Sequence, residues 1–417
     1  MSRIKAFYLF PQVGRIGEIA HRIPKIRNLY PEDTHDLTLL LGGRGFDDPE
    51  VANGAVLELM CRGVRTHFVQ QDEQAQTLFK QAKDEDGRTL WIQPDPAFTY
   101  QHFVQEFHAK PRTYTCCLNE DDLEKGRRLR ERLGIPQNAK IVTFHIREAG
   151  YLQQMEYHNY RNASIENYFY ALLHLIKKGY WIIRFGDRTM QPLKNPPEHW
   201  IDAPFHPAYE PFFEPYFIAS SRFYLGMPSG PSMVAEAFGV PQLMTNYTLN
   251  AASCENEGDL FLYKKYHSHQ LGRMLTYEEI VTGPLLDYHR KYLYETAEIT
   301  LMENTPSEIL AATWEMEARL TRSYPFMAEA NVTHQWIKEI QKKAHILRQN
   351  LITDEYYPAI RFFSSYLQKG RISHEFIRMN PGFLGQRYPK VSWGFNPTTE
   401  SLPGLMENFY LERMHQG

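Results

Sequence analysis

The stretch FYLGMPSGPSMVAEAFGVPQLMTN, residues 223–246, predicts a strand, a tight turn, a helix and a second strand. The first strand ends near Met227, and Pro231 suits the first turn of a helix, where a missing N–H loses no hydrogen bond. Gly239 is suited to end that helix. A strand, a helix and a strand in this order form the unit of a parallel sheet, so the stretch predicts an α/β fold.

The same alternation recurs on the N-terminal side of this stretch. Apolar strands are expected at Ile4–Phe10, at Leu37–Gly43 and in IVTFHIRE, residues 141–148. The charged segment EDDLEKGRRLRERLG, residues 120–134, is expected to be a helix that joins two such units. We therefore predict an α/β fold class with two Rossmann-like, doubly wound domains that face a cleft, followed by a helical C-terminal tail. After about residue 266 helical patterns replace the strands, at Glu278–Thr282, Pro306–Ser323, His334–Gln349 and Tyr356–Gln368.

The composition narrows the class of protein. The 417 residues are 43% hydrophobic and 23% charged, which is typical of a globular protein. The net charge of −3 disfavours a nucleic-acid binder that relies on a broad basic surface. The four cysteines form no CxxC motif, so we expect neither a disulfide framework nor a structural zinc site. This use of cysteine favours a cytoplasmic location. No run approaches the roughly 18 apolar residues that span a bilayer, so any membrane contact is expected to be peripheral.

Polar side chains follow two of the predicted strands. A helix that begins after Ser229 offers backbone N–H groups and the positive end of its dipole to a phosphate. Ser229, Gly230 and Ser232 form the expected phosphate-binding turn, and Glu236 is expected to accept hydrogen bonds from ribose hydroxyls. Asp187, in the motif RFGD, is expected to contact a bound nucleotide. The alternatives are an ordinary turn with a serine cap and an aspartate that caps its own turn.

Arg147 is expected at the end of the strand in residues 141–148. Its planar guanidinium suits a diphosphate, to which it can donate two charge-assisted hydrogen bonds. His145 lies on the same side of the strand, because side chains alternate with a period of two. Arg161 precedes the next helix in a long polar loop, and such loops are often functional. The alternative is that Arg147 pairs with Glu148 or another carboxylate at the surface.

The motif GRIGE, residues 14–18, stands between the first strand and the next predicted helix. Gly14, Arg15 and Gly17 form a turn whose glycines would let a substrate approach the backbone closely. Glu18 is a candidate general base that takes a proton from an acceptor hydroxyl. The alternative is a first-turn glutamate that the helix dipole stabilises.

Three of these stretches resemble known enzymes. SGPSMVAEAFGVPQLMTN is similar to the donor-binding segment of GT-B glycosyltransferases, including heptosyltransferases and fucosyltransferase-like enzymes. The series HIREAGY, YRN, RFGD, SG, FGVP and TN, within about residues 139–265, resembles a family of bacterial glycosyltransferases of surface-polysaccharide loci. GRIGEIAHRIPKIRNLYP resembles the turn of the heptosyltransferase N-terminal domain that carries the catalytic acid residue, with glutamate here in place of the usual aspartate.

The resemblance implies a GT-B glycosyltransferase with a nucleotide-sugar donor. Residues 1–125 would form the acceptor domain, residues 126–265 the donor domain, and residues 266–417 a C-terminal extension. Glu18 would be the catalytic base of an inverting displacement. Arg147 would replace a metal ion as the counter-charge of the leaving diphosphate, so neither a metal nor a further cofactor is expected. The acceptor would be a glycan, a lipid-linked molecule or a protein.

Two other functions fit the same pattern. A sugar-nucleotide epimerase can share this architecture, but it needs further acid and base groups and no acceptor site. A nucleotide-sugar-binding protein without catalytic activity would keep Arg147 and the serine–glycine turn, while Glu18 would matter little. The aromatic residues of the C-terminal tail fit a sugar acceptor, since aromatic faces stack on sugars, or they pack on the core. They are Phe362, Phe363, Tyr366, Phe376, Phe383, Tyr388 and Trp393.

Overall fold

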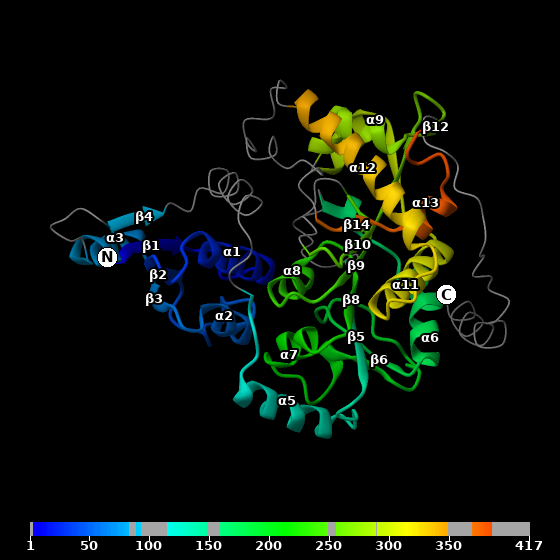
Figure 1. The fold of residues 1–417 in the computed structure, drawn as a ribbon. Coiled ribbons are helices and arrows are strands. Elements are labelled where there is room, and N and C mark those ends of the chain that lie inside the picture. The colour runs from blue at the N-terminus through cyan, green and yellow to red at the C-terminus, as the bar shows by residue number, and fades with distance from the viewer. Residues whose placement is uncertain are drawn as a thin grey trace.

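The computed structural model describes residues 3–82, 89–92, 115–148, 158–248, 256–288, 290–348 and 369–385. It contains two parallel sheets, one of four strands and one of seven, and a small antiparallel sheet of three strands. In Figure 1 the four-stranded sheet and its helices form one part of the molecule. The seven-stranded sheet and the elements around it form a second part beside the first. Among the helices of these residues, none is long and apolar enough to cross a membrane.

The N-terminal sheet has the strand order β3-β2-β1-β4, and its printed pairings are all parallel. Residues of β1 alternate between its two faces, as a buried parallel strand requires. Tyr8 and Phe10 pack with the cluster that includes α1 and α2, whereas Phe7 and Leu9 pack against α3. The elements are β1 Ile4–Phe10, α1 Ile16–Leu29, β2 His35–Gly42, α2 Gly54–Cys61, β3 Arg65–Val69, α3 Asp72–Ala82 and β4 Thr89–Ile92.

The larger sheet has the order β14-β10-β9-β8-β5-β6-β7, again with parallel pairings. From β5 the chain builds outward through β6 and β7, and then returns to the other side of β5 with β8. The predicted fold class is confirmed by these two doubly wound sheets. The strands are β5 Lys140–His145, β6 Tyr180–Arg184, β7 Trp200–Asp202, β8 Phe223–Gly226, β9 Gln242–Tyr247, β10 Leu260–Tyr263 and β14 Arg371–Ile372. The helices before residue 265 are α5 Glu120–Arg132, α6 Phe169–Lys177, α7 Phe213–Ala219 and α8 Gly230–Ala237, with 3-10 turns at Ile165–Tyr168 and Ala203–Phe205.

The chain after residue 265 contains strands as well as helices, which the sequence analysis did not predict. β11, β12 and β13 form the antiparallel sheet, and β14 joins the edge of the large sheet. Short strands of two to four residues carry too little alternation to stand out from a sequence. The predicted helix Tyr356–Gln368 lies outside the described residues. The elements are β11 Lys265–Ser268, β12 Arg273–Met274, α9 Tyr277–Thr282, a 3-10 turn Pro284–Asp287, α10 Lys291–Thr296, β13 Ile299–Met302, α11 Pro306–Leu320, α12 Met327–Arg348 and α13 His374–Met379.

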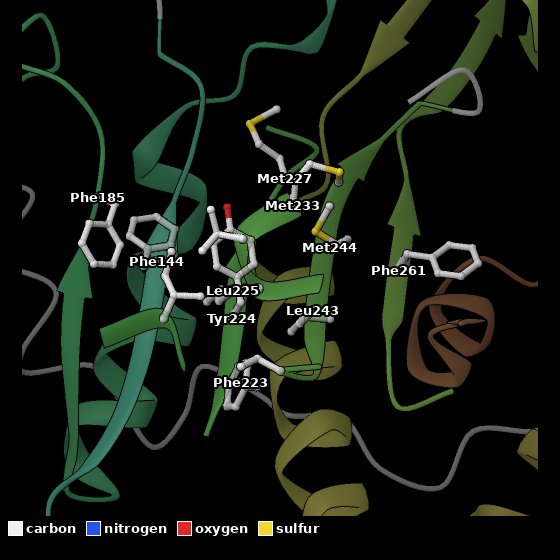
Figure 2. Close-up of a cluster of buried hydrophobic side chains, with 14 of the residues drawn as sticks. Phe144, Phe185, Phe223, Tyr224, Leu225, Met227, Met233, Leu243, Met244 and Phe261 are labelled. Carbon is white, nitrogen blue, oxygen red and sulfur yellow. The ribbon is translucent and has the colours of Figure 1, made fainter. Parts of the chain in front are cut away.

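The core of the large sheet is built from aromatic and aliphatic side chains of its middle strands. Figure 2 shows Phe144, Tyr224, Leu225, Leu243 and Met244 along these strands, and all five are almost fully buried. Burying each such side chain contributes roughly 1.5–3 kcal/mol, so this layer is a main source of stability for the sheet that carries the site.

Two of the tail aromatics belong to this core. Phe376 and Phe383 are buried, with ring centroids 5.0 Å apart, and Phe383 also stacks on Tyr263 of β10. Packing, rather than contact with a sugar, therefore explains these two residues. Phe362, Phe363, Tyr366, Tyr388 and Trp393 lie outside the described residues.

Helix α1 runs through Pro24, where the sequence predicts a kink or a break. Pro24 is buried, together with Ile19, Ile23 and Ile26 on the same helix. The apolar face of α1 is thus packed along its length, and tertiary packing outweighs the local preference of one proline.

Gly126 of α5 allows that helix to lie directly on α7. A Cβ atom at this position would fall 1.8 Å from the ring of Tyr216, whose hydroxyl accepts a hydrogen bond from Arg130 Nε at 2.8 Å. We expect Gly126→Ala to lower the free energy of unfolding by about 1–2 kcal/mol, because overpacking exceeds the gain in helix propensity. Urea unfolding checks this, with Gly45→Ala as control because a Cβ there meets no atom within 4 Å. Equal stability of the two variants would contradict the assigned contact.

Candidate active site

The candidate site lies where the large sheet reverses its strand order. β5 and β8 are neighbours, and His145 at the end of β5 pairs with Gly226 at the end of β8. The chain leaves these two strands toward opposite sides of the sheet. Open α/β sheets bind ligands at the carboxyl ends of strands at such a switch point. Arg147 and Ser229 follow the two strands, so the topology brings these two predicted residues to one edge.

The first turns of α1 and α8 meet at this edge, although they belong to different sheets (Figure 1). A Cβ atom on Gly17 would lie 3.2 Å from Gly230 Cα, and one on Gly230 would lie 2.3 Å from Ile16 Cγ2. These glycines therefore allow two backbones to touch. From the sequence we expected Gly17 to let a substrate approach the backbone. In the structure the first turn of α8 lies against Gly17 instead.

The two helix ends make the junction electropositive. The first N–H groups of a helix have no partner within the helix, and its N-terminus carries a partial positive charge. Arg15 is the N-cap residue of α1, and its side chain makes no capping hydrogen bond. Gly14 and Arg15 are exposed, and Ser229 and Gly230 are half-buried, so the junction is open to solvent on one side. The junction of two helix N-termini therefore favours an anionic ligand.

Ser232 and Glu236 differ from their predicted roles because both are buried and engaged within the protein. Ser232 Oγ donates a hydrogen bond to the carbonyl of Ser229 at 2.7 Å and accepts one from the Ser229 N–H at 3.2 Å. Glu236 Oε1 lies 3.6 Å from Nζ of Lys25 on α1, and both side chains are less than a tenth exposed. In this structure Ser232 holds the turn, and Glu236 joins the two domains.

His145 is half-buried at the end of β5, and its Nδ1 lies 3.0 Å from the carbonyl oxygen of Phe185. Burial lowers the pKa of His145 to about 4, with Arg184 and Arg147 adding to the effect. The imidazole is therefore neutral near pH 7, and its Nδ1–H donates to Phe185. A neutral His145 would orient a ligand by hydrogen bonding and would not add a positive charge.

Arg147 is half-buried beside the turn after β8. Its backbone N–H donates to Met227 Sδ at 3.0 Å, and its carbonyl accepts from the N–H of Ala163 at 3.1 Å. Glu148 pairs with Arg184 at 2.5 Å. A role of the Arg147 guanidinium in binding a diphosphate stays a prediction.

Asp187 follows β6, and Arg161 precedes the 3-10 turn Ile165–Tyr168. Asp187 Oδ1 accepts a hydrogen bond from the Thr189 N–H at 2.7 Å, which is the capping alternative that the sequence analysis left open. Arg161 lies close enough to Tyr294 of α10 to influence the pKa of its phenol, which burial raises.

Glu18 stands in the first turn of α1, directly after Gly17. Its Oε2 accepts a charge-assisted hydrogen bond from Arg22 Nε at 2.5 Å, one helical turn further on. Sequence reasoning missed Arg22, although the i,i+4 spacing of Glu and Arg on a predicted helix was a usable signal. Burial raises the pKa of the nearby Tyr8 phenol, which Arg22 lowers in turn. Arg22 thus orients the Glu18 carboxylate at the junction.

Two further contacts join the domains away from the helix ends. Arg62 at the end of α2 makes two hydrogen bonds, of 2.5 and 3.0 Å, to the carboxylate of Asp122 on α5. Asn53 Nδ2 donates to Glu214 Oε2 of α7 at 3.2 Å, while Asn53 Oδ1 caps α2 by accepting from the Val56 N–H. Within the described ranges, no group of three or more His, Cys, Asp or Glu side chains is placed to hold a metal ion.

Comparison with known proteins finds similarity only among solved structures. No protein-family model matches the chain, and no curated protein matches it. A glycosyl transferase family 9 structure from Veillonella parvula is 12% identical, with 58% of this chain and 79% of that chain covered and a TM-score of 0.36. Heptosyltransferase II of E. coli, an ADP-heptose enzyme, is 12% identical over 58% of this chain and 84% of that chain, with a TM-score of 0.32. An epimerase structure from Listeria monocytogenes is 11% identical over 59% and 80%, with a TM-score of 0.26.

We expect the free energy of unfolding to depend on both partners of the Lys25–Glu236 pair. Glu236→Gln leaves the Lys25 ammonium buried without its carboxylate and is expected to lower the free energy of unfolding by about 3 kcal/mol. The double variant Lys25→Met, Glu236→Leu should recover most of this loss, because it removes both charges. Glu124→Gln, in the half-exposed pair with Arg127, is the control and should change stability by less than about 1 kcal/mol. If Glu236→Gln unfolds like the wild type but loses nucleotide binding, Glu236 is a ligand contact instead.

Burial raises the pKa of Glu214 to about 7, with the Asn53 hydrogen bond opposing it. A carboxyl group whose pKa is higher in the folded state than in the unfolded chain stabilises the fold at low pH. Stability should therefore fall by roughly 2–3 kcal/mol as the pH rises from about 4.5 to about 7, and change little above it. Thermal unfolding across this range checks the effect, and Glu214→Gln should flatten the profile. An unchanged slope in that variant would assign the pH dependence to other groups.

Proposed function

We propose that this protein is a GT-B glycosyltransferase that moves a sugar from a nucleotide-sugar donor to a glycan, lipid-linked or protein acceptor. The observation that carries the proposal is the meeting of two helix N-termini, from two parallel sheets, beside Arg147 at a topological switch point. The motif resemblance described above supports the same activity. We include a cytoplasmic location in the proposal.

The donor diphosphate would bind at the junction of α1 and α8. The first N–H groups of both helices and the Arg147 guanidinium would donate hydrogen bonds to its oxygens. Ser229 and Gly230 would form the turn beside the diphosphate. As the glycosidic bond to the diphosphate breaks, negative charge grows on the leaving oxygen. Fixed N–H groups and a guanidinium stabilise such charge without reorganisation, and this can replace a metal ion.

Glu18 would act as the general base. Its carboxylate stands one residue after the Gly17–Gly230 contact, and therefore beside the proposed diphosphate position. It would take the proton from the acceptor hydroxyl as that oxygen attacks the anomeric carbon from the face opposite the leaving group, so the reaction would invert the configuration. Arg22 holds the carboxylate in its orientation.

Nucleotide binding and sugar transfer can be tested separately. Thermal unfolding is measured with UDP, GDP, CMP and ADP and with their sugars, each with and without EDTA. One nucleotide at a hundredfold excess over its dissociation constant should stabilise the wild type by about 2.7 kcal/mol, and EDTA should not change this. Arg147→Ala should lose the stabilisation, whereas Arg128→Ala, an exposed arginine on α5, should keep it. Glu18→Gln should keep nucleotide binding and lose turnover by at least about 100-fold.

Each competing function predicts a different result. An epimerase would convert the nucleotide sugar without an acceptor, which product analysis by NMR detects. A protein without catalytic activity would bind the nucleotide equally well in Glu18→Gln and show no turnover in the wild type. Absence of stabilisation by any nucleotide would contradict the proposed donor site.

A further inference from the structure

Arg378 of α13 is a buried arginine with an unused hydrogen-bonding edge. Its side chain is 1% exposed, and Nη1 donates to Glu375 Oε1 at 2.8 Å. Both Nε and Nη2 are buried, and neither meets a hydrogen-bond acceptor among the residues that the structure describes. Buried donors in folded proteins are almost always paired, with protein, water or a bound ion. The two N–H groups therefore indicate a ligand of Arg378.

The unused groups share one edge of the planar guanidinium. The N–H of Nε and one N–H of Nη2 point in parallel, while Nη1 lies on the other side of the group. Two parallel N–H donors match two oxygens of a single planar group, as in a bidentate arginine–carboxylate pair. We call Nε and Nη2 of this residue the Arg378 edge.

Neighbouring side chains fix the orientation of the Arg378 edge. Tyr324 donates to Glu375 Oε1 at 2.7 Å, the same oxygen that accepts from Arg378. The flat face of the guanidinium lies against the ring of Phe326, with Cζ 4.1 Å from the ring centroid. An arginine that is already held at Nη1 and on its flat face loses little conformational entropy when a ligand binds.

A second buried carboxylate beside α13 is engaged by other donors. Glu315 Oε2 accepts from Ser373 Oγ at 2.6 Å and from the N–H of Glu375 at 3.0 Å. Its Oε1 accepts from Arg319 Nε at 2.8 Å. Both oxygens of Glu315 thus hold the start of α13 on α11, and they leave the Arg378 edge to a ligand from outside these elements.

His374 adds an acceptor on the same face of α13. It lies four residues before Arg378, so the two side chains are neighbours on the helix surface. Because the single phenol proton of Tyr324 goes to Glu375, the phenol oxygen accepts from His374 Nδ1–H at 2.8 Å. Burial lowers the pKa of His374 to about 4, against the opposing charge of Glu315, so the imidazole is neutral near pH 7. Its buried Nε2 is then an acceptor that meets no donor within the described ranges.

The Arg378 edge is separate from the candidate active site. Helix α13 follows β14, which pairs with β10 at the border of the large sheet. Both β10 and β9 stand between β14 and β8, whose end carries the proposed donor site. Three strand spacings put β14 and β8 roughly 14 Å apart across the sheet.

We propose that the Arg378 edge is a second ligand site, which binds a small planar oxyanion of the carboxylate class. The N–H groups of Nε and Nη2 each donate to one oxygen of the ligand, while Nη1 stays with Glu375. Phe326 is half-buried and covers the guanidinium, so the ligand enters when this ring turns away. Carboxylates and bicarbonate present the same pair of oxygens, and bicarbonate also has a hydroxyl that can donate to His374 Nε2.

The Nε–H resonance of Arg378 reports on the site directly. The full-length protein is labelled with nitrogen-15 arginine, and sodium formate is compared with sodium chloride at equal ionic strength near pH 7. One Nε–H resonance should shift with formate until it saturates, and Arg378→Lys should lack that resonance. Phe326→Leu identifies the same resonance independently, because loss of the ring current shifts it, so the assignment stands even if Arg378→Lys does not fold.

Thermal unfolding provides a second readout of the same site. Formate should raise the melting temperature of the wild type above that in chloride. Arg378→Lys should weaken this response at least about tenfold in formate concentration, because an ammonium group does not donate two parallel hydrogen bonds. The variant keeps a cation for Glu375. Arg128→Lys, at an exposed position of α5, is the matched control and should keep the full response.

The proposal is overturned if formate and chloride act equally on the wild type, or if Arg378→Lys responds as the wild type does. An Nε–H that is already protected from exchange in chloride, and that formate does not shift, would identify a bound water instead. Arg147→Lys should keep the response, since it alters only the proposed donor site. Loss of the formate response in Arg147→Lys, with retention in Arg378→Lys, would assign formate to the donor site.

Bicarbonate and formate distinguish the two kinds of ligand within the class. His374→Asn keeps an N–H donor for Tyr324 and removes the Nε2 acceptor. A wild-type response to bicarbonate at lower concentration than to formate, with the difference lost in His374→Asn, identifies bicarbonate. Equal responses that His374→Asn does not change identify a carboxylate.

Discussion

The contact between the first turns of α1 and α8 is the constraint on which the arrangement of this protein depends. Gly17 and Gly230 bring two helix backbones together without an intervening side chain. Any larger residue at Gly230 would clash with Ile16, so the close approach of the two helices is possible because both positions lack a Cβ atom. The positive ends of two helices then converge at one place, and the proposed diphosphate site follows from that convergence.

The same contact explains why part of the predicted site is engaged elsewhere. With the helices this close, Lys25 on α1 and Glu236 on α8 face each other in the interface. A buried ammonium group requires a partner, and Glu236 supplies it. A carboxylate that could have bound a ribose thus stabilises the association of the domains, while Arg147 and the Ser229 turn remain at the edge.

A second buried network shapes the loop after β5. Arg184 is almost fully buried and bridges Glu148 and Asp202. Asp202 also accepts hydrogen bonds from Trp200 Nε1 and from the N–H of Leu193. Arg184 and Asp202 each make several hydrogen bonds, as buried charges must. Glu148 is thereby directed toward Arg184 of β6.

The sequence by itself determined the alternation of the longer strands and helices in both parallel sheets, because hydrophobic alternation, glycines and prolines act over a few residues. It placed Arg147, Ser229 and Glu18 at the ends of the correct elements. It did not reveal β4, β7 and β10 to β14, which have only two to four residues each and are too short to show a pattern. Only the tertiary structure decided that Gly17 meets Gly230, that Glu236 pairs with Lys25 and that Arg371 joins the face of α12. The physical reason is that such pairings join residues far apart in the chain, and their partners are chosen by packing rather than by local preference.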